Sequence, residues 1–175
     1  MKNMKNIERE KVDLKILIFK SGCLILKSIC LILLHVNTCG ASWLFRDSRG
    51  NVLLHSRRAF SDVSSSVHAF LLALSWLVAA MSDLKMKKVI FEFPSITAGF
   101  ALEHPLTHPT SYYSCHQVLR IINSIPGSSL HLIPITCNSP AIQIATSVIR
   151  DHRYRSYVAR LGPNWLAASL SKEAS

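Results

Sequence analysis

The sequence predicts an α/β domain in which a mixed β-sheet, with an antiparallel hairpin and parallel strands, is flanked by helices. Three observations support this fold class. Two apolar runs flank the turn sequence Asp47–Gly50, and β-rich runs follow at Val89–Phe93 and Leu130–Ile135. Apolar segments of helical length lie between and after these runs. Strands that alternate with helices are typical of a sheet covered by helices.

The hairpin over Ala41–Phe45 and Val52–His55 is the clearest local element of the chain. Its turn contains Asp47, whose carboxylate can accept hydrogen bonds from backbone N–H groups, and Gly50, which tolerates a positive φ. Both arms are apolar on nearly all positions of their two alternating faces. Because such arms need cover on both sides, we expect the hairpin to lie inside a larger sheet.

Helices are expected on the faces of this sheet. Ser61 and Asp62 are placed to cap a helix that runs from Val67 to Met81 and is apolar almost all round, as expected for a buried helix. Three further helices are predicted from periodicity and from the Pro residues that end or open them: Ile96–Glu103, Ser111–Ile125 and Ala141–Ile149.

Composition limits the class of protein. A chain of 175 residues with 49% hydrophobic content is long enough for one domain with a core, which we place at 37–150, between the segment 1–36 and a basic C-terminal tail at 151–175. The formal net charge of +10 favours an anionic partner such as nucleic acid or a membrane surface. Five cysteines without a C-x-x-C pair indicate free thiols, so we expect a reducing compartment, the cytoplasm or nucleus.

The first 36 residues leave two alternatives open. Met1–Leu14 is polar and charged, and Ile16–Val36 is strongly apolar but contains Lys20 and Lys27. An apolar residue gains about 0.3–0.6 kcal/mol on insertion into a membrane and a central lysine costs about 2.5–3.5 kcal/mol, so the contributions roughly cancel. The apolar segment is therefore either a membrane anchor or a buried segment in which Ile29–Val36 forms a strand beside the hairpin.

Four stretches, in this order, resemble the plant ribonuclease H-like family, a type 1 ribonuclease H and reverse transcriptase-like group. Arg46–Leu53 resembles the family's hairpin signature G-x-x-R-D-x-x-G, and Ala69–Leu74 resembles its helix A-E-L-x-A-L. Val89–Ser95 is similar to its strand V-I-x-E-S-D-S, and His131–Ile142 resembles its ending H-V-P-R-E-x-N-x-x-A-D. The resemblance covers about Gly40–Arg150 and implies a ribonuclease H-like fold.

The resemblance also implies a chemistry, two-metal hydrolysis of RNA–DNA hybrids by carboxylates that hold two Mg²⁺ ions. The acids are missing when the family positions are followed one by one. Phe70 stands at the helix glutamate, Pro94 at the strand aspartate and Ile142 at the last-helix aspartate. None of these side chains has the oxygen donor that Mg²⁺ needs. We therefore predict a fold without ribonuclease H activity and without a metal cofactor.

The family's first-strand aspartate has two alternative counterparts. If Asn37–Ala41 matches the family's N-T-D-G-A, then Cys39 replaces the aspartate. If Gly40 instead begins the second strand, the first strand lies within Ile16–Val36, which contains no Asp or Glu. Neither alternative provides an acid. An active Mg²⁺-dependent hybrid endoribonuclease would have to use other acids, and Glu92 is the nearest in sequence to Pro94.

Basic residues in three stretches suggest a nucleic-acid-binding surface. Arg57 and Arg58 lie near the end of the hairpin, Lys87 and Lys88 follow the long helix, and Arg153 lies among the tyrosines of the tail. Basic side chains would bind phosphates, and tyrosines can stack on bases. A solvated basic surface explains the same residues equally well. The partner that we predict is RNA or an RNA–DNA hybrid, and a membrane is the less favoured one.

Overall fold

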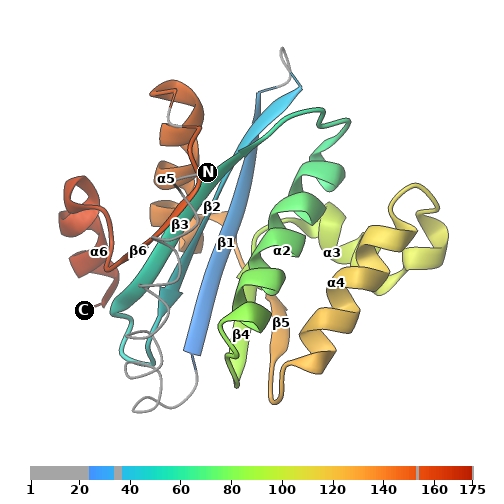
Figure 1. The fold of residues 1–175 in the computed structure, drawn as a ribbon, viewed down its shortest axis with the longest axis horizontal. Helices are drawn as coiled ribbons and strands as arrows, with labels where there is room; N and C mark the ends of the chain where they lie inside the picture. Colours follow the sequence, from blue (N-terminus) through green and yellow to red (C-terminus); the bar gives the residue numbers. More distant parts are fainter. Residues whose placement is uncertain (1–23, 34–36, 153, 175) are drawn as a thin grey trace, which may run out of the picture.

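Residues 24–33, 37–152 and 154–174 are described by the computed structural model, and these ranges contain a six-stranded mixed sheet (Figure 1). Its strand order is β5-β4-β1-β2-β3-β6. The pairs β1–β2, β2–β3 and β3–β6 are antiparallel, whereas β1–β4 and β4–β5 are parallel. The predicted fold class is confirmed. The strands are β1 (Leu24–Leu33), β2 (Thr38–Arg46), β3 (Val52–Phe60), β4 (Val89–Phe93), β5 (Ser129–Leu132) and β6 (Tyr157–Arg160).

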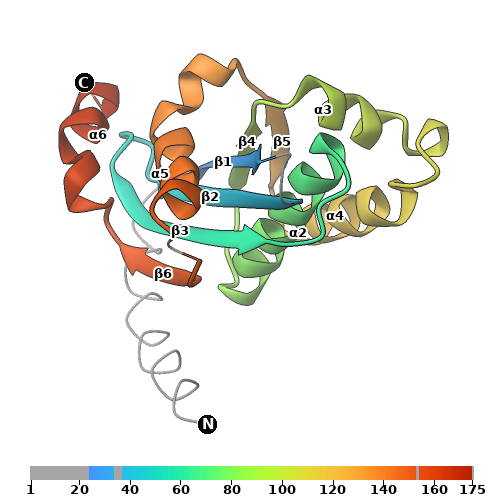
Figure 2. The same cartoon turned by 90° about the horizontal axis from the view of Figure 1, so that it is seen from above.

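Helices cover both faces of the sheet, with α2 and α4 on one side and α5 and α6 on the other (Figures 1 and 2). The larger core lies under α2, α3 and α4, and a smaller core lies under α5 and α6. The α-helices are α2 (Ser66–Asp83), α3 (Ile96–Glu103), α4 (Tyr112–Ser124), α5 (Ser139–Arg150) and α6 (Ala167–Ala174). Short 3₁₀ turns are η1 (Pro105–Thr107), η2 (Ile135–Asn138) and η3 (Asn164–Leu166).

The β2–β3 hairpin forms as its turn sequence predicts. The Asp47 carboxylate accepts hydrogen bonds from the backbone N–H groups of Arg49 and Asn51, both at 2.9 Å. Gly50 closes the turn with φ of 83°. From Cys39 onward every residue of β2 is buried, which confirms that the hairpin lies inside the sheet with cover on both sides.

The face of β2 that carries small residues determines how closely α5 approaches the sheet. A Cβ atom at Gly40 would collide with the backbone carbonyl oxygen of Ala145. The Ser42 hydroxyl donates a buried hydrogen bond of 2.6 Å to the carbonyl oxygen of Ala141. Residues two apart share a face of a strand, so Gly40 and Ser42 lie on the same face of β2. Because Gly40 has no side chain and Ser42 has a small one, α5 packs closely against this face.

The apolar segment before the hairpin contributes the central strand β1. Leu24–Leu33 pairs antiparallel with β2, with Leu26 opposite Phe45 and Cys30 opposite Ala41. The same strand pairs parallel with β4. The predicted strand Ile29–Val36 is confirmed over Ile29–Leu33, and it begins earlier than predicted, at Leu24. A membrane-spanning helix over Ile16–Val36 does not agree with it, because the strand takes ten of those residues. Residues 1–23 and 34–36 lie outside the described part of the chain.

Within the described ranges, α2 is the one helix long and apolar enough to cross a membrane. It packs instead against the sheet, and Leu74, Leu77 and Val78 are fully buried in the larger core. Its length and its continuous apolar surface therefore follow from its position between the sheet and the neighbouring helices.

Most element boundaries differ from the predictions by a few residues; β3, for example, runs to Phe60 rather than His55, and two of the differences have a clear local reason. The N-cap of α2 is Ser65, whose hydroxyl accepts a hydrogen bond of 3.1 Å from the His68 N–H, rather than Ser61 or Asp62. The backbone N–H of Val63 donates to Asn37 and holds the preceding segment against the sheet instead. β5 ends at Leu132, three residues earlier than predicted, because Pro134 has no N–H for a strand ladder and the chain enters η2.

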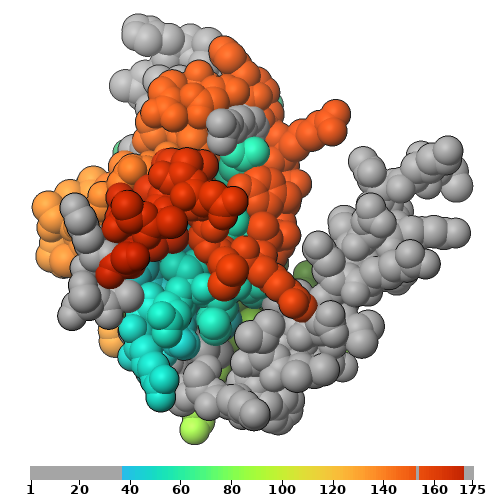
Figure 3. Space-filling view, turned by 90° about the vertical axis from the view of Figure 1, so that its left-hand side faces the viewer, coloured from blue at the N-terminus to red at the C-terminus, as the bar shows by residue number. Residues whose placement is uncertain are grey.

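The segment after Arg150, which we predicted to be a tail, contributes a strand to the sheet. β6 pairs with β3, and Leu166 and Leu170 pack into the smaller core with α5. Figure 3 shows this C-terminal segment, in orange and red, lying over the cyan β2–β3 region. The sheet and the smaller core therefore both continue beyond residue 150.

Candidate functional site

The three positions that we predicted to correspond to the family's catalytic acids lie on different elements. Phe70 is in the second turn of α2, Pro94 directly follows β4, and Ile142 is in the first turn of α5. Phe70 belongs to the core on the α2 face, while Ile142 packs against the core on the α5 face. Phe70 and Ile142 therefore lie on opposite faces of the sheet.

Phe70 is part of the hydrophobic core rather than the wall of a polar cleft. Its side chain is 4% exposed, and its ring centre lies 5.2 Å from that of Phe93, the last residue of β4. The Phe93 ring also lies close to Gly99 on α3, since a Cβ atom added at Gly99 would be 3.4 Å from the ring. The helix position of the resembled active site is thus packed here against an aromatic ring of β4, the residue that precedes Pro94.

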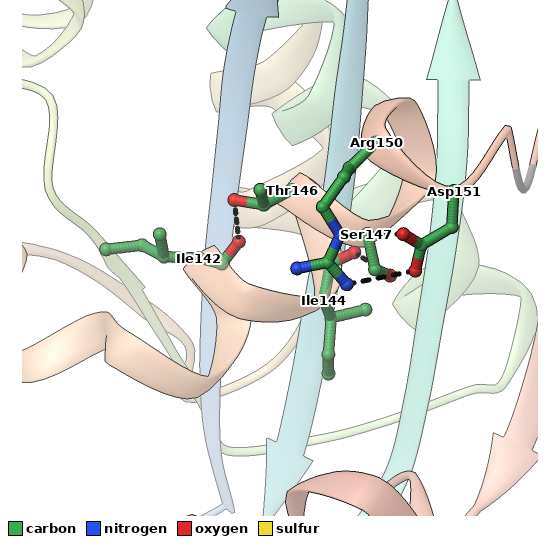
Figure 4. A network of polar contacts seen from close by, with 6 residues as sticks. All are labelled: Ile142, Ile144, Thr146, Ser147, Arg150 and Asp151. Carbon is green, nitrogen blue, oxygen red and sulfur yellow. Dashed lines mark hydrogen bonds and ion pairs between the residues drawn. The ribbon is translucent and has the colours of Figure 1, made fainter.

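Ile142 presents an aliphatic side chain on α5, and the hydroxyl groups near it bond within the helix. The Thr146 hydroxyl donates to the Ile142 carbonyl oxygen at 2.8 Å, and the Ser147 hydroxyl donates to that of Ile144 at 2.7 Å (Figure 4). At the end of the helix, the Arg150 guanidinium forms two hydrogen bonds with Asp151, at 2.6 and 3.0 Å. In Figure 4 the Ile142 side chain points away from this ion pair.

The strand order decides between the two alignments of the first-strand aspartate. Cys39 lies on β2, the second strand, where it is buried beside Val63 and Ala69. The first strand of the sheet is β1, whose sequence LILKSICLIL contains neither Asp nor Glu. The structure thus favours the alignment in which Gly40 begins the second strand, and Cys39 is a small core residue rather than a substitute for the catalytic acid.

The acids near these positions do not form a magnesium site. Asp47 lies at the hairpin turn, where burial raises the pKa of its carboxyl but hydrogen bonds from Asn51 and Arg49 outweigh this and lower it. Glu92 is the only acid on β4. Among the residues that the structure describes, no three His, Cys, Asp or Glu side chains lie close enough together to hold a metal ion. The residues present at the family positions do not fit Mg²⁺, which requires several oxygen ligands.

The basic residues predicted to bind nucleic acid fall into separate places. Arg57 and Arg58 are adjacent on β3, so their side chains leave opposite faces of the sheet. The Arg57 guanidinium lies 4.7 Å from the centre of the Tyr157 ring, and that of Arg58 lies 5.0 Å from the Phe60 ring. Arg57 is therefore held against a ring of the neighbouring strand β6, and Arg58 against a ring at the end of its own strand.

Lys87 and Lys88 precede β4 and lie at the other end of the sheet. In the strand register, Arg57 is level with the residues just after β4, whereas Lys88 comes just before its first residue, a separation of about 20 Å along the strands. The structure does not bring the lysines together with the arginines. Arg153 lies outside the described residues.

Comparison with known proteins shows the family to which this chain belongs. A family model described as reverse transcriptase-like matches residues 35–148, which is more than half of the sequence. The chain belongs to this family. No curated protein sequence matches the chain. The family has a ribonuclease H-like fold, which the hairpin, the central parallel strands and the flanking helices of this structure reproduce.

Solved ribonucleases H1 share the fold at low sequence identity. The enzyme of the halophilic archaeon Halobacterium salinarum superposes with a TM-score of 0.63 at 14% identity, over 74% of this chain and 99% of that one. A ribonuclease H1 isolated from compost by a metagenomic approach gives 0.64 at 16% identity, over 74% and 97%. The same compost enzyme in complex with an RNA/DNA hybrid gives 0.58 at 17% identity, over 74% and 98%. At these identities the likeness shows the fold.

One surface feature was missed by the sequence analysis. On the outward side of α4, five polar and aromatic residues line a shallow hollow of about 300 Å³: Tyr112, Tyr113, His116, Gln117 and Arg120. The available signal was their spacing, because residues four apart share a face of a helix. The pattern is short, and without the structure its direction relative to the core is unknown.

Proposed function

We propose that this chain is a ribonuclease H-like domain that binds nucleic acid, RNA or an RNA–DNA hybrid, and does not cleave it. The observation that carries the proposal is the packing of Phe70, at the family's helix glutamate, against Phe93 in the hydrophobic core. Two-metal hydrolysis needs carboxylate oxygens to hold the ions and to place the attacking water. Pro94 and Ile142 add no oxygen from their side chains at the other two positions.

Binding is the part of the family's function that does not require these acids. Twenty Lys and Arg residues against ten Asp and Glu give the chain a net charge that attracts phosphates. The ribonuclease H1 from compost has been solved with an RNA/DNA hybrid, so the fold provides a frame that can hold such a ligand. We propose that the present chain binds the same class of ligand.

A hybrid cleavage assay with the full chain tests the proposal. An end-labelled RNA–DNA hybrid is incubated with the chain in Mg²⁺ and, separately, in Mn²⁺, with an active ribonuclease H1 as the positive control. We expect no cleavage above that of the chain in a metal chelator. Binding to the same hybrid, followed by fluorescence anisotropy at low salt, is expected to saturate and to weaken as salt is raised.

Two results would contradict the proposal. Metal-dependent cleavage that Glu92→Gln abolishes would show that the chain is an active endoribonuclease that uses acids other than those of the family. Failure to bind RNA or hybrid at low salt, by a chain that melts cooperatively, would show that it has also lost nucleic acid binding.

A further inference from the structure

We propose that the outward face of α4, together with Lys87 and Lys88, is a binding surface for single-stranded nucleic acid. This inference rests on the proposed function and names the surface and the ligand. The helix α4 lies at the edge of the molecule farthest from α5 and α6 (Figures 1 and 2). We call its outward residues and the two lysines the α4 surface: Lys87, Lys88, Tyr112, Tyr113, His116, Gln117 and Arg120.

The buried residues of α4 show which side of the helix faces the core and which side faces the solvent. Cys115, Val118 and Ile122 are buried in the larger core. Residues spaced by four from Tyr112 and Tyr113 lie on the opposite side of the helix, away from that core. The Tyr113 side chain is 71% exposed and that of Tyr112 is 39% exposed. These are large aromatic surfaces that no other described element covers.

Contacts along the helix hold the aromatic rings in place. The Tyr112 and His116 rings lie 5.1 Å apart, centre to centre. The Gln117 side-chain amide donates a hydrogen bond of 2.6 Å to the Tyr113 hydroxyl. Because each ring is partly ordered before a ligand arrives, stacking a base on it costs less side-chain entropy than on an unrestrained ring.

Positive charge continues this surface past the end of α4. Arg120 is exposed on the same side as the rings. The backbone N–H of Lys88 donates a hydrogen bond of 2.8 Å to the carbonyl oxygen of Pro126, which lies just beyond the helix. Both lysines are exposed, and the sequence contains no Asp or Glu between Glu103 and Asp151. The helix thus carries only positive formal charge toward the solvent.

The dimensions and the chemistry indicate a single strand. Tyr113 and Ser124 are separated by about 17 Å along the helix axis, so the surface is long enough for a strand of several nucleotides. Exposed aromatic rings stack on the faces of unpaired bases, and in a duplex these faces are hidden by the neighbouring base pairs. The row of tyrosine, histidine, arginine and lysine therefore fits a short unpaired strand, with bases on the rings and phosphates on the basic groups.

Fluorescence anisotropy with a labelled ten-nucleotide oligouridine tests the inference on the full chain. We expect Tyr113→Ala to weaken binding roughly five- to a hundredfold through the loss of one stacking ring. Tyr113→Phe keeps the ring and is expected to bind within about twofold of the parent chain. Arg120→Ala is expected to reduce the slope of log affinity against log salt by about 0.7.

Matched controls separate this surface from the rest of the basic protein. Arg49→Ala removes the same charge from the hairpin turn, and Trp165→Ala removes an exposed ring in η3. Both are expected to bind oligouridine like the parent chain. Thermal melts of all variants should coincide within about 2 °C, since the changed side chains are exposed.

Three outcomes overturn the inference. The first is wild-type affinity for oligouridine in Tyr113→Ala, and the second is a loss in Trp165→Ala as large as that in Tyr113→Ala. The third is the absence of any oligouridine binding, including the case in which the α4 surface contacts a protein instead.

If oligouridine binding is unaffected by Tyr113→Ala but the hybrid is bound and not cleaved, the proposed function stands and the assignment of the α4 surface is wrong. If the hybrid is cleaved, the proposed function fails independently of the α4 result.

Discussion

From the resemblance we predict that Phe70 stands where the ribonuclease H-like family carries a helix glutamate, so Phe70→Glu would restore that residue type. In an open catalytic cleft such a carboxylate would be tolerated. In this chain Phe70 is 4% exposed and its ring contacts that of Phe93. We therefore expect Phe70→Glu to unfold the domain rather than to recreate a metal ligand.

The magnitude follows from what the core loses. Removing a buried phenylalanine ring costs about 3–5 kcal/mol, and an unpartnered buried carboxyl adds about 1–3 kcal/mol. The sum, about 4–8 kcal/mol, approaches the whole stability of an ordinary domain. Each kcal/mol lowers the melting temperature of a chain of this size by about 2–4 °C, so we expect a fall of at least roughly 8 °C or no cooperative transition at all.

Differential scanning fluorimetry and circular dichroism measure this effect against two matched variants. Phe70→Leu keeps an apolar side chain and should cost about 1–2 kcal/mol, while Phe100→Glu adds the same charge at a residue that is 52% exposed and should change stability by about 0.5 kcal/mol or less. Because burial raises the pKa of the introduced carboxyl, the destabilisation of Phe70→Glu should be smaller at pH 4 than at pH 7. A melting temperature within about 2 °C of the parent at pH 7 would refute the assignment of position 70 to the core.

Two further predictions concern the parts of the sheet that the helices and β6 hold. Gly40→Ala should destabilise the domain by about 2 kcal/mol or more in urea unfolding, because the added Cβ collides with the Ala145 carbonyl oxygen. The control Ala59→Gly, opposite Gly40 on β3, should cost only about 1 kcal/mol. Equal losses in the two variants would contradict the close packing of α5 on Gly40. Burial and the nearby Arg57 charge lower the pKa of His55 despite its hydrogen bond to the Leu161 carbonyl. Below its ordinary pKa of about 6.5 the unfolded chain therefore binds more protons than the folded one, so stability should fall between pH 7 and pH 5, and this fall should be smaller in His55→Gln. Parallel pH profiles of the parent and His55→Gln in urea unfolding would show that His55 does not contribute to it.

Local chemistry made several elements predictable from the sequence. The hairpin turn depends on Asp47 and Gly50, which act on backbone groups only a few residues away. The helix over Ile96–Glu103 was predicted with the boundaries it has, because Pro94-Ser95 and His104-Pro105 mark both of its ends. The absence of oxygen donors at Phe70, Pro94 and Ile142 is a property of the side chains themselves and needs no coordinates.

Contacts between distant segments account for what the sequence left open. The choice between Cys39 and an earlier strand depended on whether Leu24–Leu33 pairs with both β2 and β4, and hydrogen bonds between segments more than sixty residues apart decide that pairing. The strand β6 exists because the edge of β3 offers partners to a short segment that has little periodicity of its own.

Residue types at fixed spacings were enough to predict a ribonuclease H-like fold and to predict that the family's acids are replaced in this chain. The tertiary structure decided what replaces them. Packing buries Phe70 against Phe93, and the folding of the chain places Lys88 next to the end of α4, more than thirty residues later in the sequence. Non-local packing sets both arrangements, since neither the burial of a ring nor the continuity of a surface is a property of a local stretch.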